Sequence, residues 1–171
     1  RDVSRGPAEL LFVGAMHRDA NIDAVRWFHG EILPRVRTEI SGVRLTVAGA
    51  SPPAEIQRLA AASGVEVTGF VDALEPLYAR ATVFVAPLRI AGGTAGKTLD
   101  ALAAGCPVVT TTIGNDGIGA TPGQHLLTAD SPADFADAVI RLLRDRIVRD
   151  ELGESARRFH DADGPAVQRH P

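Results

Sequence analysis

The chain has 171 residues, of which 45% are apolar and 23% are charged, and its formal net charge at pH 7 is −3. This length fits one well-filled domain rather than two of ordinary size, and the slight acidity argues against a nucleic-acid-binding protein, whose affinity depends on a basic face. A single cysteine, Cys106, excludes an intrachain disulfide, and no apolar run approaches the roughly 20 residues that span a bilayer, so the composition predicts a soluble, cytoplasmic domain.

Five short apolar runs, separated by helical patterns, follow one another along the chain. The runs are nearly continuous in apolar residues rather than alternating, which is typical of parallel strands covered on both faces. A regular succession of strand and helix predicts a parallel sheet with right-handed crossovers. We therefore expect an α/β fold, a single domain built on a doubly wound parallel sheet. The predicted strands cover residues 10–13, 43–48, 65–70, 82–86 and 107–111.

Amphipathic stretches between these runs predict helices. The first contains Pro34, which removes a backbone donor and predicts a break or kink near Leu33. Gly64 and Gly105 follow the second and fourth stretches, where a glycine in the left-handed conformation is the expected end of a helix. The predicted helices cover residues 22–36, 54–63, 74–79 and 94–104.

The last third of the chain predicts two more helices. Residues 131–134, Ser-Pro-Ala-Asp, combine an N-cap serine, a proline at the first helical position and an acid in the first turn. A second helix is expected from about Val148 to Phe159. Residues 161–171 contain turn formers without periodicity and are predicted to be a flexible tail, which leaves residues 1–160 as the domain.

The loops that follow the five strands form the candidate site, because ligands of open parallel sheets bind outside the carboxyl ends of the strands. Four of these loops contain glycine, which lets backbone N–H groups approach a ligand closely. Lys97 is the only lysine of the chain, and it follows a glycine-rich turn at residues 90–96 that leads into a predicted helix. A helix N-terminus offers free N–H groups to an anion. This segment therefore predicts a phosphate site, and a diphosphate fits its chemistry.

Four motifs in this order resemble the carboxy-terminal, donor-binding domain of a GT-B glycosyltransferase of the family 4 type. The resemblance runs from Leu10 to about Phe159, and the motifs are specific only when taken together. They are Asn-Ile-Asp-Ala-Val-Arg-Trp-Phe at residues 21–28, Val-Thr-Gly-Phe-Val-Asp at 67–72, Ala-Pro-Leu-Arg-Ile running through Gly-Gly-Thr to the lysine at 86–97, and Leu-Asp-Ala-Leu-Ala-Ala-Gly-Cys-Pro-Val-Val at 99–109.

The resemblance implies a role for individual residues. Lys97 matches the residue that binds the nucleotide diphosphate and stabilises the charge that builds on the leaving group, which makes it the catalytic candidate. Asp100 takes the place of a glutamate whose carboxylate accepts hydrogen bonds from the ribose hydroxyls. The other residues assigned to donor binding flank the nucleobase (Phe70, Val71), the sugar and phosphates (Arg89, Gly92, Gly93, Thr94) or the diphosphate from the other side (Gly14, Arg18).

Two departures from the family pattern affect this assignment. The family often carries a first glutamate eight residues before the second, and here Gly92 stands in that place without a side chain. A branch of the family with a Pro-Leu-Arg and glycine-rich turn also lacks this acid. Asp100 replaces the second glutamate and is shorter by roughly 1.5 Å, so its ribose contact is expected to be water-bridged or lost.

The implied function is transfer of a hexose-type sugar from a nucleoside diphosphate sugar to an acceptor, with retention of configuration. The resemblance implies no cofactor and no tightly bound metal, because a lysine and a helix N-terminus supply the positive field. Because the chain begins at Arg1 rather than at a methionine, we expect a segment of a longer protein from which the acceptor-binding N-terminal domain is missing. The segment alone is expected to be inactive, and relatives of this type often work at the membrane surface.

Another enzyme class fits part of the pattern. Residues 91–98 differ from a P-loop by Ala91 in place of the first glycine, so a P-loop-like nucleoside-triphosphate-binding domain is the alternative. The late position of its strand and the lack of a downstream run ending in a magnesium-binding acid count against it. A receiver-like or flavodoxin-like module needs carboxylates at the strand ends, where Gly14, Ala50 and Phe70 stand instead.

Purely structural alternatives also exist. Lys97 fits an exposed ion pair with Asp100, Arg89 fits a strand-end cap, and the glycines at 114 and 117 fit a plain turn. The five histidines are scattered without ligand spacing, so no metal site is predicted. Cys106 is expected to pack as a small hydrophobe.

Overall fold

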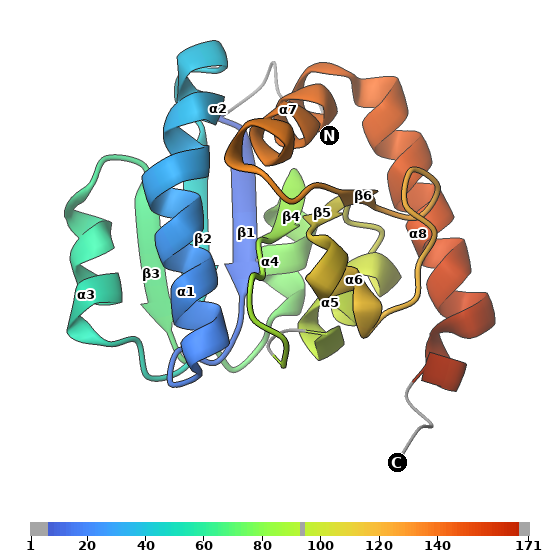
Figure 1. Cartoon of the computed structure of the whole chain (residues 1–171), viewed down its shortest axis with the longest axis horizontal. Helices are drawn as coiled ribbons and strands as arrows, with labels where there is room; N and C mark the ends of the chain where they lie inside the picture. The colour runs from blue at the N-terminus through green and yellow to red at the C-terminus, as the bar shows by residue number, and fades with distance from the viewer. Residues whose placement is uncertain (1–6, 93–94, 168–171) are drawn as a thin grey trace.

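The computed structural model of the chain describes residues 7–92 and 95–167, and a six-stranded parallel sheet lies at its centre (Figure 1). The strand order β3-β2-β1-β4-β5-β6 is the doubly wound arrangement that the sequence predicts. Five strands coincide with the five predicted runs. The strands are β1 (Glu9–Val13), β2 (Arg44–Ala48), β3 (Val65–Gly69), β4 (Val83–Ala86), β5 (Val108–Thr110) and β6 (Leu127–Thr128).

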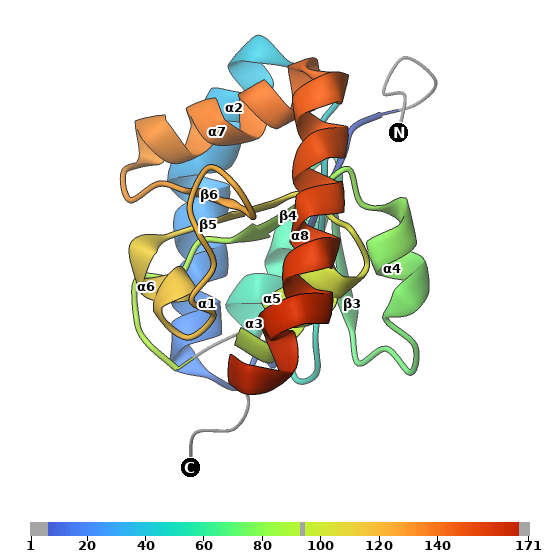
Figure 2. The same ribbon diagram turned by 90° about the vertical axis from the view of Figure 1, so that its right-hand side faces the viewer.

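Helices cover both faces of the sheet, as Figure 2 shows with α1 and α2 on one side and α4 on the other. Leu10 and Phe12 of β1 face one core, and Leu11 and Val13 face the other, because successive side chains of a strand point to opposite faces. The helices are α1 (Asp19–Trp27), a π-helical segment η2 (Phe28–Ile32), α2 (Leu33–Glu39), α3 (Ala54–Gln57), a 3₁₀ turn η3 (Arg58–Ala61), α4 (Glu75–Arg80), α5 (Ala95–Ala103), α6 (Thr112–Asp116), α7 (Pro132–Arg144) and α8 (Arg146–Val167).

Three local predictions are confirmed. The first helical stretch is interrupted by η2, and α2 begins at Leu33 with Pro34 in its first turn. Gly64 and Gly105 have φ angles of 75° and 73°, as helix-ending glycines do. The Ser131 hydroxyl accepts a hydrogen bond from the N–H of Asp134 at 3.1 Å, which caps the N-terminus of α7.

Two local predictions are wrong. Residues 112–117 were expected to form a plain loop but contain α6, because the Thr111 hydroxyl accepts a hydrogen bond from the Gly114 N–H at 3.0 Å and caps a short helix. Helix α8 was expected to end near Phe159 and continues to Val167, so residues 161–167 are helical rather than a tail. Extending an existing helix costs little compared with nucleating one. The last four residues, 168–171, lie outside the described part.

The carboxyl ends of the strands define the edge at which the site is expected. The arrows of β1 and β3 end at the lower edge of Figure 1, where α1 also begins. The strand order reverses between β1 and β4, because β2 and β3 lie on one side of β1 and β4 to β6 lie on the other. A crevice for ligands opens at such a switch point.

Candidate functional site

The loops after β1 and β4 meet at the switch point. Arg18, which precedes the first turn of α1, donates a hydrogen bond to the carbonyl of Gly92 at 3.3 Å. Gly92 has a φ of 94°, a conformation that glycine adopts without strain. On the neighbouring strand end, the N–H of Gly14 donates to the Ala48 carbonyl at 3.0 Å. Three of the predicted donor-binding residues therefore lie where the strand order reverses.

A hollow of ≈ 660 Å³ lies between the loop after β3 and the helices α4 and α5. Four residues predicted to bind the donor line it: Phe70, Val71, Lys97 and Asp100. Phe70 is 73% exposed, so its ring is free to contact a planar ligand. The other lining residues are Asp72, Leu74, Glu75, Tyr78, Ala79, Ala103 and Ala104.

Helix α5 directs Lys97 and Asp100 toward the hollow because its other face is buried. Thr98 and Leu99 are 1% and 4% exposed, whereas Lys97 and Asp100 are both exposed. Residues three apart share a helix face, and these two both line the hollow. No ion pair joins them in the described part of the chain, so the structural alternative of a surface salt bridge is not formed.

Tyr78 of α4 fixes the first turn of α5, and the sequence analysis did not single it out. Its hydroxyl donates a hydrogen bond to the Lys97 carbonyl at 3.0 Å. Burial, with a further contribution from Asp100, raises the pKa of Tyr78, so the phenol stays protonated and remains a donor. Two features of the sequence could have pointed to Tyr78: it is the only tyrosine of the chain, and it lies in the helical stretch directly before the fourth strand.

Arg89 points away from the hollow. Its guanidinium donates two hydrogen bonds to Asp23 of α1, at 3.1 Å and 2.7 Å, and lies 5.2 Å from the ring centroid of Trp27. Arg89 does not line the hollow, and it is not brought together with Lys97. The remaining predicted residues, Gly93 and Thr94, lie outside the described residues.

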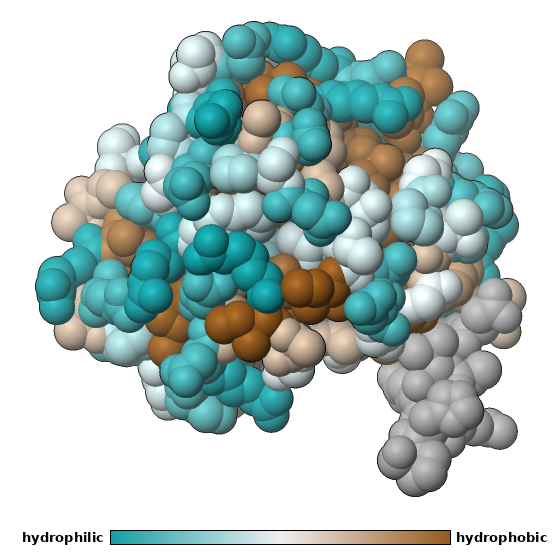
Figure 3. Space-filling view, viewed as in Figure 1, coloured by the Kyte–Doolittle hydropathy of each residue, from teal (hydrophilic) through white to brown (hydrophobic). Residues whose placement is uncertain are grey.

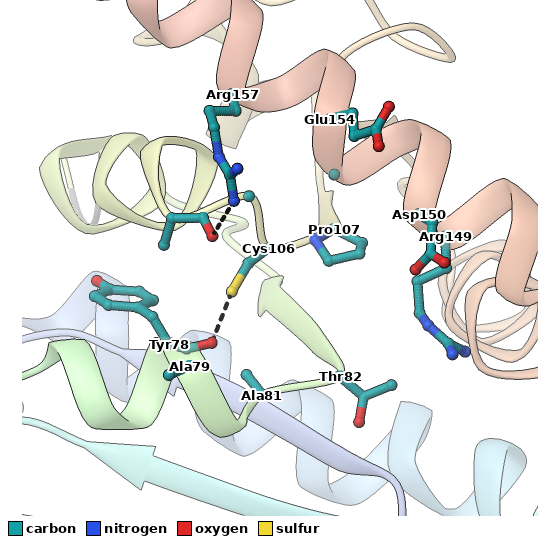
Figure 4. Close-up of a pocket in the computed structure, with 13 residues that line it drawn as sticks. Tyr78, Ala79, Ala81, Thr82, Cys106, Pro107, Arg149, Asp150, Glu154 and Arg157 are labelled. Atoms are coloured by element: carbon teal, nitrogen blue, oxygen red, sulfur yellow. Dashed lines mark hydrogen bonds between the residues drawn. The ribbon is translucent and has the colours of Figure 1, made fainter. Parts of the chain in front are cut away.

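A second hollow, of ≈ 390 Å³, lies at the opposite edge, where β4 and β5 begin, and Figure 4 shows its lining. Its two arginines join α8 to neighbouring elements. Arg149 donates to two carbonyls of α7, and Arg157 donates to the carbonyl of Ala104, directly after α5, at 3.3 Å. Cys106 is 4% exposed, and its thiol donates to the Tyr78 carbonyl at 3.1 Å, which confirms the expected packing role. This hollow is a seam between α8 and the sheet edge.

Apolar surface lies next to the glycine turn. Ile90 and Ile113 are 47% and 41% exposed, and brown surface interrupts the mostly teal face over α6 and the adjoining loop in Figure 3. Within residues 7–92 and 95–167, no three His, Cys, Asp or Glu side chains gather as a metal site would require. Over the same residues, no helix has the length and apolar character to cross a membrane.

Residues 7–145 match the model of a family described as Glycosyl transferases group 1. Over 139 residues the chain is 27% identical to an uncharacterized 44.6 kDa protein of the cps region of Klebsiella pneumoniae, and the match covers 77% of this chain and 36% of that protein. The chain therefore spans little more than a third of the length of this relative.

Solved structures share the fold. The C-terminal domain of a glycosyl transferase group 1 family protein (LpcC) from Francisella tularensis matches with a TM-score of 0.76 at 14% identity, covering 94% of this chain and 89% of that one. A TarM mutant from S. aureus, in complex with fondaparinux, alpha-GlcNAc-glycerol and UDP, matches with a TM-score of 0.74 at 16% identity, covering 94% of this chain and 34% of that one. The sucrose-phosphate synthase of Thermosynechococcus elongatus matches with a TM-score of 0.74 at 23% identity, covering 94% of this chain and 43% of that one.

Proposed function

The chain belongs to the Glycosyl transferases group 1 family, and we propose that it is the donor-binding half of an enzyme that transfers a hexose-type sugar from a nucleoside diphosphate sugar to an acceptor with retention of configuration. The observation that carries the proposal is the hollow between the loop after β3 and the helices α4 and α5. Phe70 and Val71 from one loop and Lys97 and Asp100 from one helix line it together, and the family resemblance assigns all four to the donor.

The pairing of the cations at the carboxyl edge of the sheet supports an anionic ligand. Arg89 is paired with Asp23 at 2.7 Å. Lys97 and Arg18 have no carboxylate partner within the described residues. A diphosphate that binds these two side chains therefore breaks no ion pair, and it gains charge-assisted hydrogen bonds.

In the proposed reaction, the bond between the anomeric carbon of the sugar and the diphosphate oxygen breaks, the acceptor hydroxyl oxygen forms the new bond to that carbon, and the hydroxyl proton passes to the leaving diphosphate. Negative charge builds on the leaving diphosphate, where Lys97 and the N–H groups of α5 would stabilise it. Phe70 and Val71 would contact the nucleobase and Asp100 the ribose. UDP in the TarM complex supports a nucleoside diphosphate as the leaving group, and no metal or cofactor is part of the proposal.

A second domain completes the proposed enzyme. Transfer needs the acceptor beside the donor, and the chain spans only part of the length of its relatives. The exposed Ile90 and Ile113 beside the glycine turn offer apolar surface for an acceptor-binding domain that closes over the site. We expect this segment alone to bind nucleotide and to turn over no donor sugar.

The P-loop alternative has less support. A P-loop protein needs an acidic residue near the end of a neighbouring strand to hold magnesium. The neighbours of β4 are β1 and β5, and they end in Val13 and Thr110, with Gly14 and Thr111 following.

Calorimetric titration of UDP, GDP, ADP and ATP, each with and without magnesium, tests the proposed function on the chain itself. We expect a nucleoside diphosphate to bind without magnesium and EDTA to leave its affinity unchanged. A hydrogen bond to a charged group contributes about 1.5–3 kcal/mol, so Lys97→Ala should weaken binding by roughly 10-fold to 100-fold.

Arg35→Ala is the matched control, because Arg35 is an exposed cation on α2, at the other end of the molecule from the carboxyl edge (Figure 1). Its removal changes the net charge as much as the loss of Lys97 and should leave the affinity within about twofold of the parent. Magnesium-dependent binding of ATP alone would favour the P-loop instead. A chain that binds none of the four nucleotides would refute the donor site.

A further inference from the structure

The Arg89 side chain ties the loop after β4 to helix α1. Its Nε and terminal nitrogen reach both carboxylate oxygens of Asp23, at 3.1 Å and 2.7 Å, and its guanidinium carbon lies 5.2 Å from the Trp27 ring centroid. The sequence offered Arg89 as a ligand of the donor. In the structure its donors are instead directed at a helix on the other side of the switch point.

The two side chains that contact Arg89, Asp23 and Trp27, are themselves largely buried. Trp27 is 5% exposed and packs edge-on against Phe135 of α7, with 6.1 Å between ring centroids. The Asp23 side chain is 17% exposed. Exposed ion pairs are usually weak. A two-pronged arginine–carboxylate pair is stronger and fixes the orientation of the guanidinium, and the contact with an aromatic ring adds a cation–π attraction.

In the loop after β4, Arg89 is the last residue before the exposed residues 90–92 whose side chain contacts another element. One residue earlier, Leu88 is 4% exposed, and its carbonyl accepts a hydrogen bond from the Thr111 hydroxyl. Beyond Arg89, residues 90–92 are exposed, and a Cβ added at Gly92 would meet nothing within 4 Å. Residues 90–92 therefore have little packing of their own, and two contacts hold them: the Arg89 side chain on α1 at one end and the hydrogen bond from Arg18 to the Gly92 carbonyl at the other.

We propose that Arg89 is a positioning residue, which acts through Asp23 and Trp27 to hold residues 90–92 where a nucleoside diphosphate meets them. This inference rests on the proposed function. The Arg89–Asp23 pair joins α1, which follows β1, to the loop that follows β4. Breaking it removes one of the two contacts that hold residues 90–92 and weakens diphosphate binding, although neither Arg89 nor Asp23 touches the ligand.

The sign of one substitution separates positioning from direct binding. Asp23→Asn removes a negative charge from the binding edge and releases the Arg89 guanidinium. If Arg89 were a direct phosphate ligand, both changes would strengthen binding of an anion. For a positioning residue, Asp23→Asn weakens binding as Arg89→Ala does, and we expect each to raise the Kd for the best-bound nucleoside diphosphate by about threefold to tenfold.

Two further variants test the path of the effect. Arg89→Lys keeps the charge but cannot make the two-pronged contact, and its affinity should lie between those of the parent and Arg89→Ala. In a double-mutant cycle, Arg89→Ala should weaken binding less when Asp23 is already asparagine, because the contact between the two side chains is then already broken. Independent, multiplicative effects would argue against positioning.

The control is Arg144→Ala, which breaks a comparable exposed pair with Glu39 at 2.9 Å between α7 and α2. Calorimetry should give the parent affinity for this variant, and thermal unfolding should verify that every variant is folded. Tighter binding by Asp23→Asn, or an unchanged Kd for Arg89→Ala, would overturn the positioning role while leaving the donor site in place. Failure of the parent chain to bind any nucleoside diphosphate would instead overturn the proposed function and this inference with it.

Discussion

Gly49→Ala should destabilise the chain strongly, because Gly49 lies at the carboxyl end of β2 against the end of β1. A Cβ added at Gly49 would lie 1.8 Å from the carbonyl oxygen of Gly14 and 2.7 Å from its carbonyl carbon. Both atoms belong to the backbone, so no side-chain rotation relieves the clash. Gly49 also has a φ of 149°, which residues with a side chain rarely adopt.

The size of the effect follows from this geometry. Ordinary contact begins at about 3.4 Å, so the two strand ends would have to separate by roughly 1.6 Å. That movement strains the hydrogen bond from the Gly14 N–H to the Ala48 carbonyl, which joins the two loops. Forced overpacking costs about 1–3 kcal/mol and an unfavourable φ a further 1–3 kcal/mol, so we expect a loss of about 2–6 kcal/mol.

Guanidinium unfolding followed by circular dichroism measures this loss. Gly30→Ala is the matched control: Gly30 lies in η2, an added Cβ there meets nothing within 4 Å, and alanine should stabilise the helical segment by about 0.5–1 kcal/mol. A Gly49→Ala protein whose unfolding free energy lies within about 1 kcal/mol of the parent would show that the close approach of β1 and β2 is wrong.

Three other outcomes follow from the structure. Gly153→Ala should lose about 1–2 kcal/mol of unfolding free energy, because the added Cβ would lie 2.5 Å from the Gly105 carbonyl oxygen and the clash outweighs the gain of about 1 kcal/mol in helix propensity; a more stable variant would contradict this. Ser131→Ala should cost about 0.5–2 kcal/mol through loss of the α7 cap, measured in the same unfolding assay, and no change would mean that the cap is not formed. Burial, together with the charge of Arg37, lowers the pKa of His29 below its ordinary value of 6.5. The unfolded chain then binds the proton more readily, so the melting temperature should fall as the pH drops below about 6.5, and His29→Gln should reduce that fall; equal slopes in the two proteins would rule the effect out.

The sheet was predictable because burial on both faces leaves a clear mark in the sequence. β1, β2 and β4 are buried through most or all of their length, and such strands appear as uninterrupted apolar runs. β6 has only two residues, both half-buried, which is too short for any pattern. α6 escaped prediction because Gly114 within it and Gly117 directly after it indicate a turn, and only the Thr111 cap identifies it as a helix.

The gathering of four of the predicted residues around one hollow was predictable to the extent that topology decides it. Parallel strands end at one edge of the sheet, so the segments that follow β3 and β4 bring together Phe70, Val71, Lys97 and Asp100. This placement does not depend on contacts between the side chains. Tyr78 was missed because its contact is made with a backbone carbonyl of α5, and no residue type at position 97 reveals that contact. The direction of Arg89 was equally hidden, since its partner lies 66 residues earlier in the chain.

An arginine in the Pro-Leu-Arg motif can therefore do one of two jobs, and the residue in α1 decides between them. Where an acid occupies the position of Asp23 and an aromatic ring that of Trp27, the guanidinium is held on α1 and positions the turn. Where the acid is absent, the same guanidinium is unpaired at the edge where we propose that a diphosphate binds, and direct contact with phosphate becomes the favoured role. Chains that carry the motif should keep arginine and acid together or lose both, and frequent pairing of the arginine with a neutral residue at the position of Asp23 would count against the positioning role.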